Sequence, residues 1–232
     1  MAPALTEHLS RAAASQAAAA LAVASLGAAI LARGKASLLV SGGSTPVEMF
    51  ERLASAPLDW SCVTVGLVDE RWVAPDHPDS NERLVRAHLL QGPARAAAFV
   101  AMKTPEDNPA AAAADRSAAY APHCSPADFV LLGMGKDGHT ASWFPGNPAL
   151  AQLVSPPDGA CVAAVEAPGA TVPQRMTLTV PAVNSARRGV LLIFGAAKRA
   201  VFEAAAMADP LQCPVRYAMD GMGNRLAIHW AP

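Results

Sequence analysis

Seven apolar runs of strand length recur along the chain, separated by helix-like segments, and this alternation limits the possible folds more than any other feature. The runs span residues 36–41, 62–69, 97–102, 128–135, 160–167, 189–195 and 225–230. They are continuously apolar, as expected of strands that are buried on both faces. Helices are expected over 46–55, 81–90, 109–121 and 196–208. The pattern predicts an α/β fold of three layers, in which helices flank a largely parallel, Rossmann-like sheet.

The length and composition are those of an ordinary soluble globular protein. A chain of 232 residues is most simply one domain, spanning 1–232, and is long enough to bury a large core. The sequence is 52% hydrophobic and 16% charged, with a formal net charge of -1. Because no extended basic surface is indicated, we do not expect a nucleic-acid partner.

The N-terminal stretch "AAASQAAAALAVASLGAAILARG" (12–34) is apolar enough to be mistaken for a signal peptide or a membrane span. It is dominated by alanine rather than leucine, and no lysine or arginine precedes Arg11 to form a basic leader. Alanine is the strongest helix former. We therefore expect a helix packed on the sheet, in a protein that does not enter a membrane.

The four cysteines are too far apart in the sequence to suggest a metal site or a redox motif. Three of them lie in or beside apolar stretches, which favours buried free thiols. Such thiols are typical of a reducing compartment, so a cytoplasmic location is expected. The four are Cys62, Cys124, Cys161 and Cys213.

Three polar clusters follow the predicted strands, at 41–46, 69–71 and 135–140. Ligands of open parallel sheets bind beyond the carboxyl ends of the strands. The three clusters are therefore expected to converge on one crevice.

The first cluster, in "SGGSTPVEMF" (41–50), has the composition of a phosphate-binding loop. Gly42 and Gly43 allow close approach of the backbone, and the start of the following helix offers free N–H groups to an anion. Ser44 and Thr45 add hydroxyl donors. We expect Thr45 to be the N-cap of this helix and Pro46 its first residue.

The third cluster, "GMGKDGHT" (133–140), fits two nucleotide-binding patterns, but both fail on context. A Walker loop would have lysine where His139 stands, and a dinucleotide fingerprint would follow the first strand of the sheet. What is left is an Asp-x-His pair on a glycine-rich turn. Histidine titrates near neutrality and suits a general base, which Asp137 would orient. A metal site is not expected, because no further ligand cluster is present.

The second cluster, in "VGLVDERW" (65–72), places three ionisable groups side by side, at Asp69, Glu70 and Arg71. Three ionisable groups at the end of a strand favour a functional site over a solvated loop. An ion pair between Asp69 and a neighbour would, however, keep Asp69 from acting as a base. Further along, Lys198 lies near a helix start, where a cation is unfavourable unless it meets an anion. Arg175 is equally well explained as a surface residue or as a ligand contact.

Together these segments resemble the glucosamine-6-phosphate isomerase/6-phosphogluconolactonase family. The resemblance rests on "SGGSTP", "VDERWVAPDHPDSNERL", "LLGMGKDGHTASWFPG", "RMTLTVPAVNSA" and "GAAKRAVFEAA", in order over about residues 38–206. The five segments together are specific to this family, although each segment alone is weak evidence for it. Trp143 departs from the pattern, in which leucine is expected, and the C-terminal segment from Pro214 matches only loosely.

The resemblance implies hydrolysis of 6-phospho-D-glucono-1,5-lactone to 6-phosphogluconate, in the oxidative pentose phosphate pathway and without a cofactor. His139 would be the base that activates water. The phosphate and the developing oxyanion would be bound by the Gly42–Thr45 loop, Arg71 and Lys198, with weaker support for Arg175. Asp69 corresponds to a residue that acts as a base in the deaminase relatives. Its role here is open, and hydrogen bonding to sugar hydroxyls beside Asn81 is one assignment.

Two alternatives are left open by the residues. One is a sugar-phosphate isomerase or deaminase on the same scaffold, with Asp69 moving a proton between carbons. The other is a phosphosugar sensor without catalysis. In each case the expected partner is a small phosphorylated sugar or sugar lactone, and the protein is expected to be a monomer or a small homo-oligomer.

Overall fold

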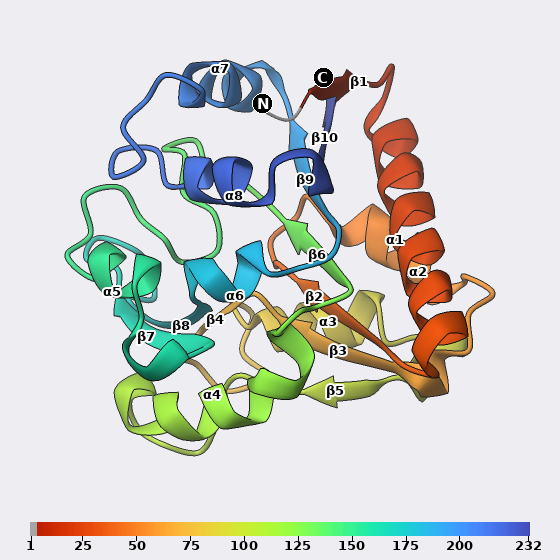
Figure 1. Cartoon of the computed structure of the whole chain (residues 1–232), viewed down its shortest axis with the longest axis horizontal. Coiled ribbons are helices and arrows are strands. Elements are labelled where there is room, and N and C mark those ends of the chain that lie inside the picture. The colour runs from red at the N-terminus through yellow and green to blue at the C-terminus, as the bar shows by residue number, and fades with distance from the viewer. Residues whose placement is uncertain (1–3) are drawn as a thin grey trace.

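The computed structural model describes residues 4–232 and contains a seven-stranded sheet whose neighbouring strands are all parallel (Figure 1). This confirms the predicted α/β class and the parallel sheet. In spatial order the strands are β1 (Leu5–Glu7), β10 (Leu226–Ala231), β9 (Gly189–Phe194), β6 (Phe129–Leu132), β2 (Ala36–Val40), β3 (Val63–Leu67) and β5 (Ala98–Val100).

Helices cover the sheet on both sides. The helix α1 packs on α2 and on β2, β9 and β10, whereas α6 and α8 lie on the other side of the sheet (Figure 1). The four predicted helices are present within a few residues of their expected bounds, while α5, α6 and α8 were not predicted. The helices are α1 (Arg11–Arg33), α2 (Val47–Ala54), α3 (Asn81–His88), α4 (Pro109–Cys124), α5 (Leu150–Val154), α6 (Val180–Asn184), α7 (Ala196–Ala205) and α8 (Val215–Met222).

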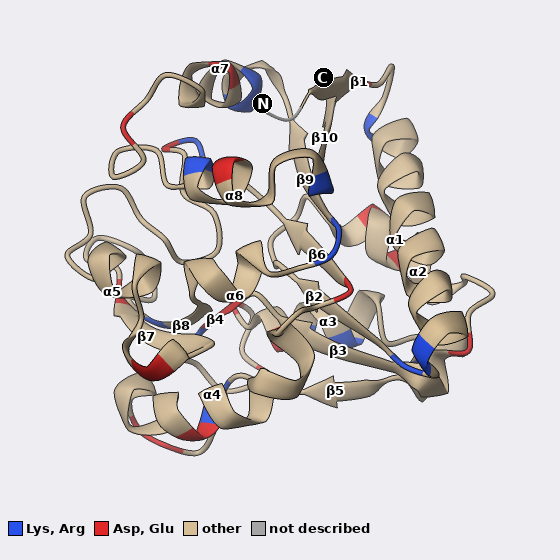
Figure 2. Ribbon diagram, in the orientation of Figure 1, with Lys and Arg blue, Asp and Glu red and all other residues tan. Residues whose placement is uncertain are grey.

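The alanine-rich N-terminal segment forms α1, which confirms a helix packed on the sheet. Its length and composition would also suit a membrane span. However, Ala14, Ala18, Ala22 and Leu26 recur every four residues and are fully buried, as on the core-facing side of a packed helix. Charged residues occur only at its two ends (Figure 2).

A second, three-stranded antiparallel sheet was not predicted. It consists of β4 (Asp69–Arg71), β8 (Gln174–Leu178) and β7 (Val162–Glu166), in that order. Two expectations are therefore wrong. The run 62–69 leaves the main sheet after Leu67, and the run 160–167 belongs to the small sheet. An apolar run shows that a strand is buried, but not which sheet it joins.

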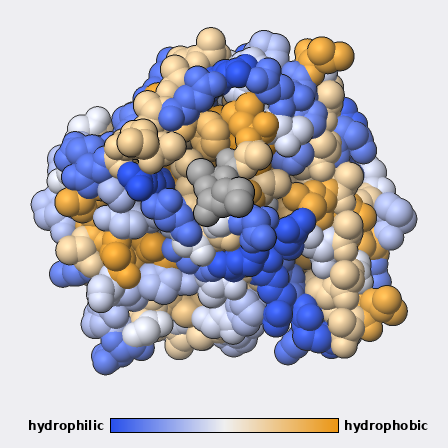
Figure 3. Space-filling view, turned by 45° about the horizontal axis from the view of Figure 1, so that its top comes forward, coloured by the Kyte–Doolittle hydropathy of each residue, from blue (hydrophilic) through white to orange (hydrophobic). Residues whose placement is uncertain are grey.

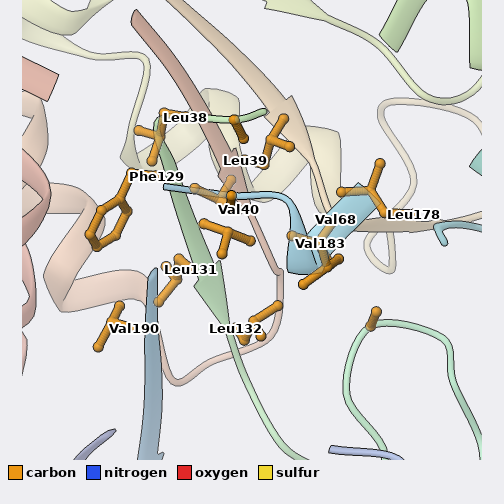
Figure 4. Close-up of a cluster of buried hydrophobic side chains, with 14 of the residues drawn as sticks. Leu38, Leu39, Val40, Val68, Phe129, Leu131, Leu132, Leu178, Val183 and Val190 are labelled. Carbon is orange, nitrogen blue, oxygen red and sulfur yellow. The ribbon is translucent and has the colours of Figure 1, made fainter. Parts of the chain in front are cut away.

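Val68 connects the two sheets. Its N–H donates to Val40 O at 2.9 Å, and its carbonyl accepts the N–H of Leu178 at 2.8 Å. Its side chain lies with those of Leu178 and Val183, beside the aliphatic side chains of β2 and β6 (Figure 4). The small sheet is thereby fixed at the carboxyl end of the main sheet, where Asp69 begins β4.

The chain leaves β2 and β6 in opposite directions, which creates the crevice that such sheets use for ligands. The next strand after β2 is β3, on one side, whereas the next main-sheet strand after β6 is β9, on the other. Ligands of open α/β sheets bind at such a switch point. The loops at 41–46 and 133–141 lie directly beyond it.

The surface is mixed in character. On the face shown in Figure 3, apolar residues form several separate patches divided by hydrophilic residues. Large exposed apolar side chains include Leu9, Leu31 and Met207. Cys124, Cys161 and Cys213 are buried and Cys62 is half-buried, all as free thiols, as predicted.

Candidate active site

A cavity of about 260 Å³ opens at the carboxyl ends of β2 and β6. The three predicted polar clusters meet there, joined by residues from α3, β8 and α7. Of the predicted site residues, Asp137 alone does not line it. The lining residues are Ser41, Gly42, Gly43, Ser44, Thr45, Asp69, Arg71, Asn81, Gly133, Met134, Gly135, His139, Thr140, Ala141, Arg175 and Lys198.

The glycine-rich loop after β2 forms one wall. Gly43 has φ +88°, a conformation that side chains disfavour. A Cβ on Gly42 would lie 1.8 Å from Asn81 Oδ1, so only glycine allows Asn81 to pack here. The prediction of Thr45 as N-cap is wrong, because Pro46 already has helical dihedrals and takes that position without a side-chain cap. The hydroxyl of Thr45 is therefore not used as a helix cap.

The turn after β6 carries the His–Asp pair. Nδ1 of His139 lies 2.6 Å from Oδ1 of Asp137. A carboxylate can only accept hydrogen bonds, so Nδ1 carries a proton, and in the neutral imidazole Nε2 is then the proton acceptor. The hydrogen bond from the His139 ring holds the pKa of Asp137 below its usual value, against an opposing effect of burial. The arrangement is that of an oriented general base.

Backbone contacts fix this turn. The N–H of Gly135 donates to His139 O at 2.8 Å, and the N–H of Val215 donates to Gly138 O at 2.9 Å. A Cβ on Gly135 would lie 2.2 Å from His139 Nδ1 and 2.4 Å from Asp137 Oδ1. Glycine is therefore required at 135 if the pair is to keep its place.

Phe144 connects the histidine to a cation and was missed from the sequence. Its ring lies 4.9 Å from the His139 ring, and the Arg175 guanidinium lies 5.5 Å from the centre of the same ring. Sequence motifs gave no signal for this contact, because it joins a loop to a strand of the small sheet.

Asp69 lies in the cavity wall formed by the small sheet, and it is buried. Its Oδ2 accepts the hydroxyl of Ser142 at 2.7 Å and lies 3.9 Å from Nη1 of Arg175. The cation that pairs with Asp69 is thus Arg175 and not its sequence neighbour Arg71. Nη1 of Arg71 instead donates to Asp79 O at 2.9 Å and to Asn81 Oδ1 at 2.6 Å.

Three cationic side chains face the cavity. Arg71 and Arg175 are directly opposite in the register of β4 and β8. Burial lowers the pKa of Arg175, while Asp69 opposes this effect. Burial, reinforced by nearby Lys136, also lowers the pKa of Lys198. Asp69 supplies one negative charge beside Arg175, and an anionic ligand would offset the positive charge that is left in the cavity.

Within residues 4–232, no group of three or more His, Cys, Asp or Glu side chains has an arrangement that could hold a metal ion. The chemical groups of the cavity are therefore an oriented histidine, a carboxylate, three cations and the N–H groups of a glycine-rich loop.

Comparison with known proteins identifies the family. The family model described as "Glucosamine-6-phosphate isomerases/6-phosphogluconolactonase" matches residues 9–228. The chain belongs to this family. It is 45% identical over 208 residues to the 6-phosphogluconolactonase of Rhizobium meliloti, covering 89% of each chain. It is 42% identical to that of Pseudomonas aeruginosa, covering 89% of this chain and 86% of the relative.

A solved structure shows the same fold. The crystal structure of a 6-phosphogluconolactonase from Shewanella baltica superposes with a TM-score of 0.95 at 35% identity, covering 99% of this chain and 98% of the other. The range matched by the family model, residues 9–228, includes every residue that lines the cavity. Trp143, the departure noted in the sequence, is fully buried and donates from Nε1 to Leu178 O at 2.8 Å, so it does not face the cavity.

Proposed function

We propose that this chain is an enzyme that hydrolyses 6-phospho-D-glucono-1,5-lactone to 6-phosphogluconate, a step of the oxidative pentose phosphate pathway. The observation that carries this proposal is the His139–Asp137 pair at a cavity lined by Arg71, Arg175 and Lys198. Relatives up to 45% identical over most of the chain are named 6-phosphogluconolactonase. A phosphorylated lactone needs both features, an activated water and an anion site.

His139 acts as the general base. Its Nε2 takes a proton from water as the water oxygen bonds to the lactone carbonyl carbon, and the carbonyl electrons move onto oxygen. The tetrahedral intermediate then collapses, the bond to the ring oxygen breaks, and the imidazolium returns the proton to that oxygen. Asp137 supports the imidazolium charge. General-base assistance of this kind is worth about 100- to 10,000-fold.

The remaining side chains bind and orient the substrate. The Gly42–Thr45 loop and Lys198 hold the phosphate, and Arg71 and Arg175 stabilise the negative charge of phosphate or oxyanion. The Asp69 carboxylate accepts hydrogen bonds from sugar hydroxyls, and the Asn81 amide N–H donates to one. The carboxylate of Asp69 already accepts from Ser142, which favours this binding role over proton transfer between carbons.

Three assays on chelator-treated protein test the reaction class. The protein should accelerate loss of 6-phosphogluconolactone above the spontaneous rate and release one acid equivalent per turnover. It should neither release ammonia from glucosamine 6-phosphate nor interconvert aldose and ketose phosphates. Ammonia release without lactonase activity would establish the deaminase alternative. Inactivity in all three assays with intact phosphosugar binding would establish a sensor.

A single domain over 1–232, a cytoplasmic location and a monomeric or small homo-oligomeric state are parts of the same proposal. The match over residues 9–228 supports the single domain, and the packing of α1 on the sheet supports a helix that does not span a membrane.

A further inference from the structure

Glu70 is a buried carboxylate beside the cavity that the proposed mechanism does not use. It lies in β4 between Asp69 and Arg71, and its side chain is fully buried. Successive side chains of a strand point to opposite faces. Asp69 and Arg71 therefore line the cavity, while Glu70 points away from it, toward the start of α3.

No cation neutralises this carboxylate. None of the ion pairs found among residues 4–232 includes Glu70. Its neighbour Arg71 turns the guanidinium elsewhere, to Asp79 O and Asn81 Oδ1. Burial raises the pKa of Glu70, and backbone hydrogen bonds, from Asn81 foremost, oppose this.

Neutral donors stabilise the charge instead. Oε2 accepts the N–H of Glu82 at 2.8 Å and the hydroxyl of Ser80 at 3.1 Å. Oε1 accepts the N–H of Arg71 at 2.8 Å and that of Asn81 at 2.7 Å. Two of these N–H groups belong to the first turn of α3, where a negative charge is favourable.

The Oε1 atom thus holds two residues of the cavity wall at once. Arg71 and Asn81 are bound to it through their backbones and to each other through their side chains, at 2.6 Å. Asn81 also donates to Asp69 O at 2.8 Å and packs on Gly42. A shift of either backbone would move the guanidinium of Arg71.

We propose that Glu70 is a positioning residue, whose Oε1 fixes Arg71 and Asn81 as one unit in the cavity wall. Because its charge is met by neutral donors, the positive charge of Arg71 is left for the substrate's anionic group. This proposal rests on the proposed function, in which Arg71 binds an anion of the substrate.

A double-mutant cycle tests whether Glu70 acts through Arg71. Glu70→Gln keeps the size of the side chain but removes its charge and one acceptor. It should lower kcat/KM by about tenfold when Arg71 is present, within the usual range for coupled neighbours, and by less than about twofold in the Arg71→Ala background. The proposal would be overturned if Glu70→Gln lowered kcat/KM by the same factor with and without Arg71. It would also be overturned if Glu70→Gln alone kept wild-type activity.

Ser80→Ala is the matched control. Ser80 is the N-cap of α3 and also donates to Glu70, so its loss loosens the same helix end but leaves both Oε1 contacts intact. It should lower the melting temperature while keeping kcat/KM within about twofold of wild type. If Ser80→Ala lost as much activity as Glu70→Gln at a similar melting temperature, Glu70 would be a structural residue only.

Two further measurements cover the cases in which the proposed function fails or the Glu70→Gln variant does not fold. If the wild type proves to have no lactonase activity, the proposed function fails, and the same cycle is measured on calorimetric binding of 6-phosphogluconate. If Glu70→Gln does not fold, Glu70→Asp replaces it in the cycle. The shorter aspartate keeps the charge but not the reach of Oε1, so it too should lose activity only when Arg71 is present.

Discussion

The imidazole of His139 and the carboxylate of Asp137 are joined at 2.6 Å, with His139 facing the cavity and Asp137 behind it. The carboxylate fixes the tautomer of the neutral ring with the proton on Nδ1, so that Nε2 is its proton acceptor. The pair is held in a turn where a Cβ on Gly135 or Gly138 would clash with a neighbouring side chain. Its position beside three cations links water activation to anion binding.

Replacing His139 by alanine should lower kcat by about 100- to 10,000-fold, with KM little changed, because the general base is lost while the binding groups stay. Steady-state rates corrected for spontaneous hydrolysis measure this. His88→Ala is a matched control, since its side chain has the same 34% exposure and also pairs with a carboxylate, Glu51, but does not line the cavity. A folded His139→Ala variant that keeps a tenth of the activity would refute the assignment.

Asp137→Asn should lower kcat less than His139→Ala does. The amide can still accept a hydrogen bond from Nδ1, but it no longer supports the imidazolium charge. The ratio of the two kcat losses is the measurement. A loss equal to that of His139→Ala would mean that the orientation of the ring depends wholly on the carboxylate charge.

Gly135→Ala should lower kcat by about 100-fold, because the added Cβ would lie 2.2 Å from His139 Nδ1 and displace the base. Kinetics and circular dichroism on the same sample separate this from unfolding. Gly27→Ala in α1 meets its nearest neighbour, Leu58, at an ordinary 3.6 Å and should stay fully active. Wild-type kcat in Gly135→Ala would show that the His139–Asp137 geometry is not needed.

Lys198→Ala and Arg71→Ala should each lower kcat/KM for the phosphorylated lactone by about 10- to 150-fold, as expected when a charge-assisted contact is lost. The decisive comparison uses the same lactone without its phosphate. A phosphate contact predicts a much smaller loss on that substrate, whereas an oxyanion contact predicts equal losses on both. Lys35→Ala, on the exposed surface, serves as the control.

Acid should destabilise the fold through a histidine pair far from the cavity in sequence. Burial, with the nearby His8 ring, lowers the pKa of His229 to about 4. His229 therefore binds a proton more readily in the unfolded chain than in the folded protein. The free energy of unfolding has its full value above about pH 6.5 and falls by up to about 3 kcal/mol as the pH decreases toward 4. Urea unfolding at pH 7.5 and pH 5 measures it.

His229→Gln should flatten that dependence, because glutamine does not titrate but can still hydrogen-bond to His8, whose Nε2 lies 2.7 Å from His229 Nδ1 in the wild type. An unchanged difference between the two pH values in this variant would assign the acid sensitivity to other groups.

The sequence by itself determined the parallel sheet and the place of the site on it. Buried parallel strands need continuous apolar runs, and the polar clusters at 41–46 and 135–140 directly follow two such runs. Since parallel strands end at the same edge, both clusters lie at that edge, and the strand order, in which β2 pairs with β6, makes them neighbours. The Asp-x-His spacing likewise put both side chains on one glycine-rich turn, and the conformation of that turn brings Asp137 to His139.

Only the tertiary structure decided how the cavity wall that contains Asp69, Arg71 and Arg175 is built. The position of Arg175 opposite Arg71 depends on the register of β4 and β8, strands about a hundred residues apart that no local pattern aligns. Likewise, three adjacent ionisable residues do not show which of them pair. The hydrogen bonds from the start of α3 to Glu70 left Arg71 free for the cavity, and they depend on how α3, which begins eleven residues further along the chain, packs on β4. Local propensity acts over a few residues, whereas hydrogen-bond partners and burial are set by the packing of the whole chain.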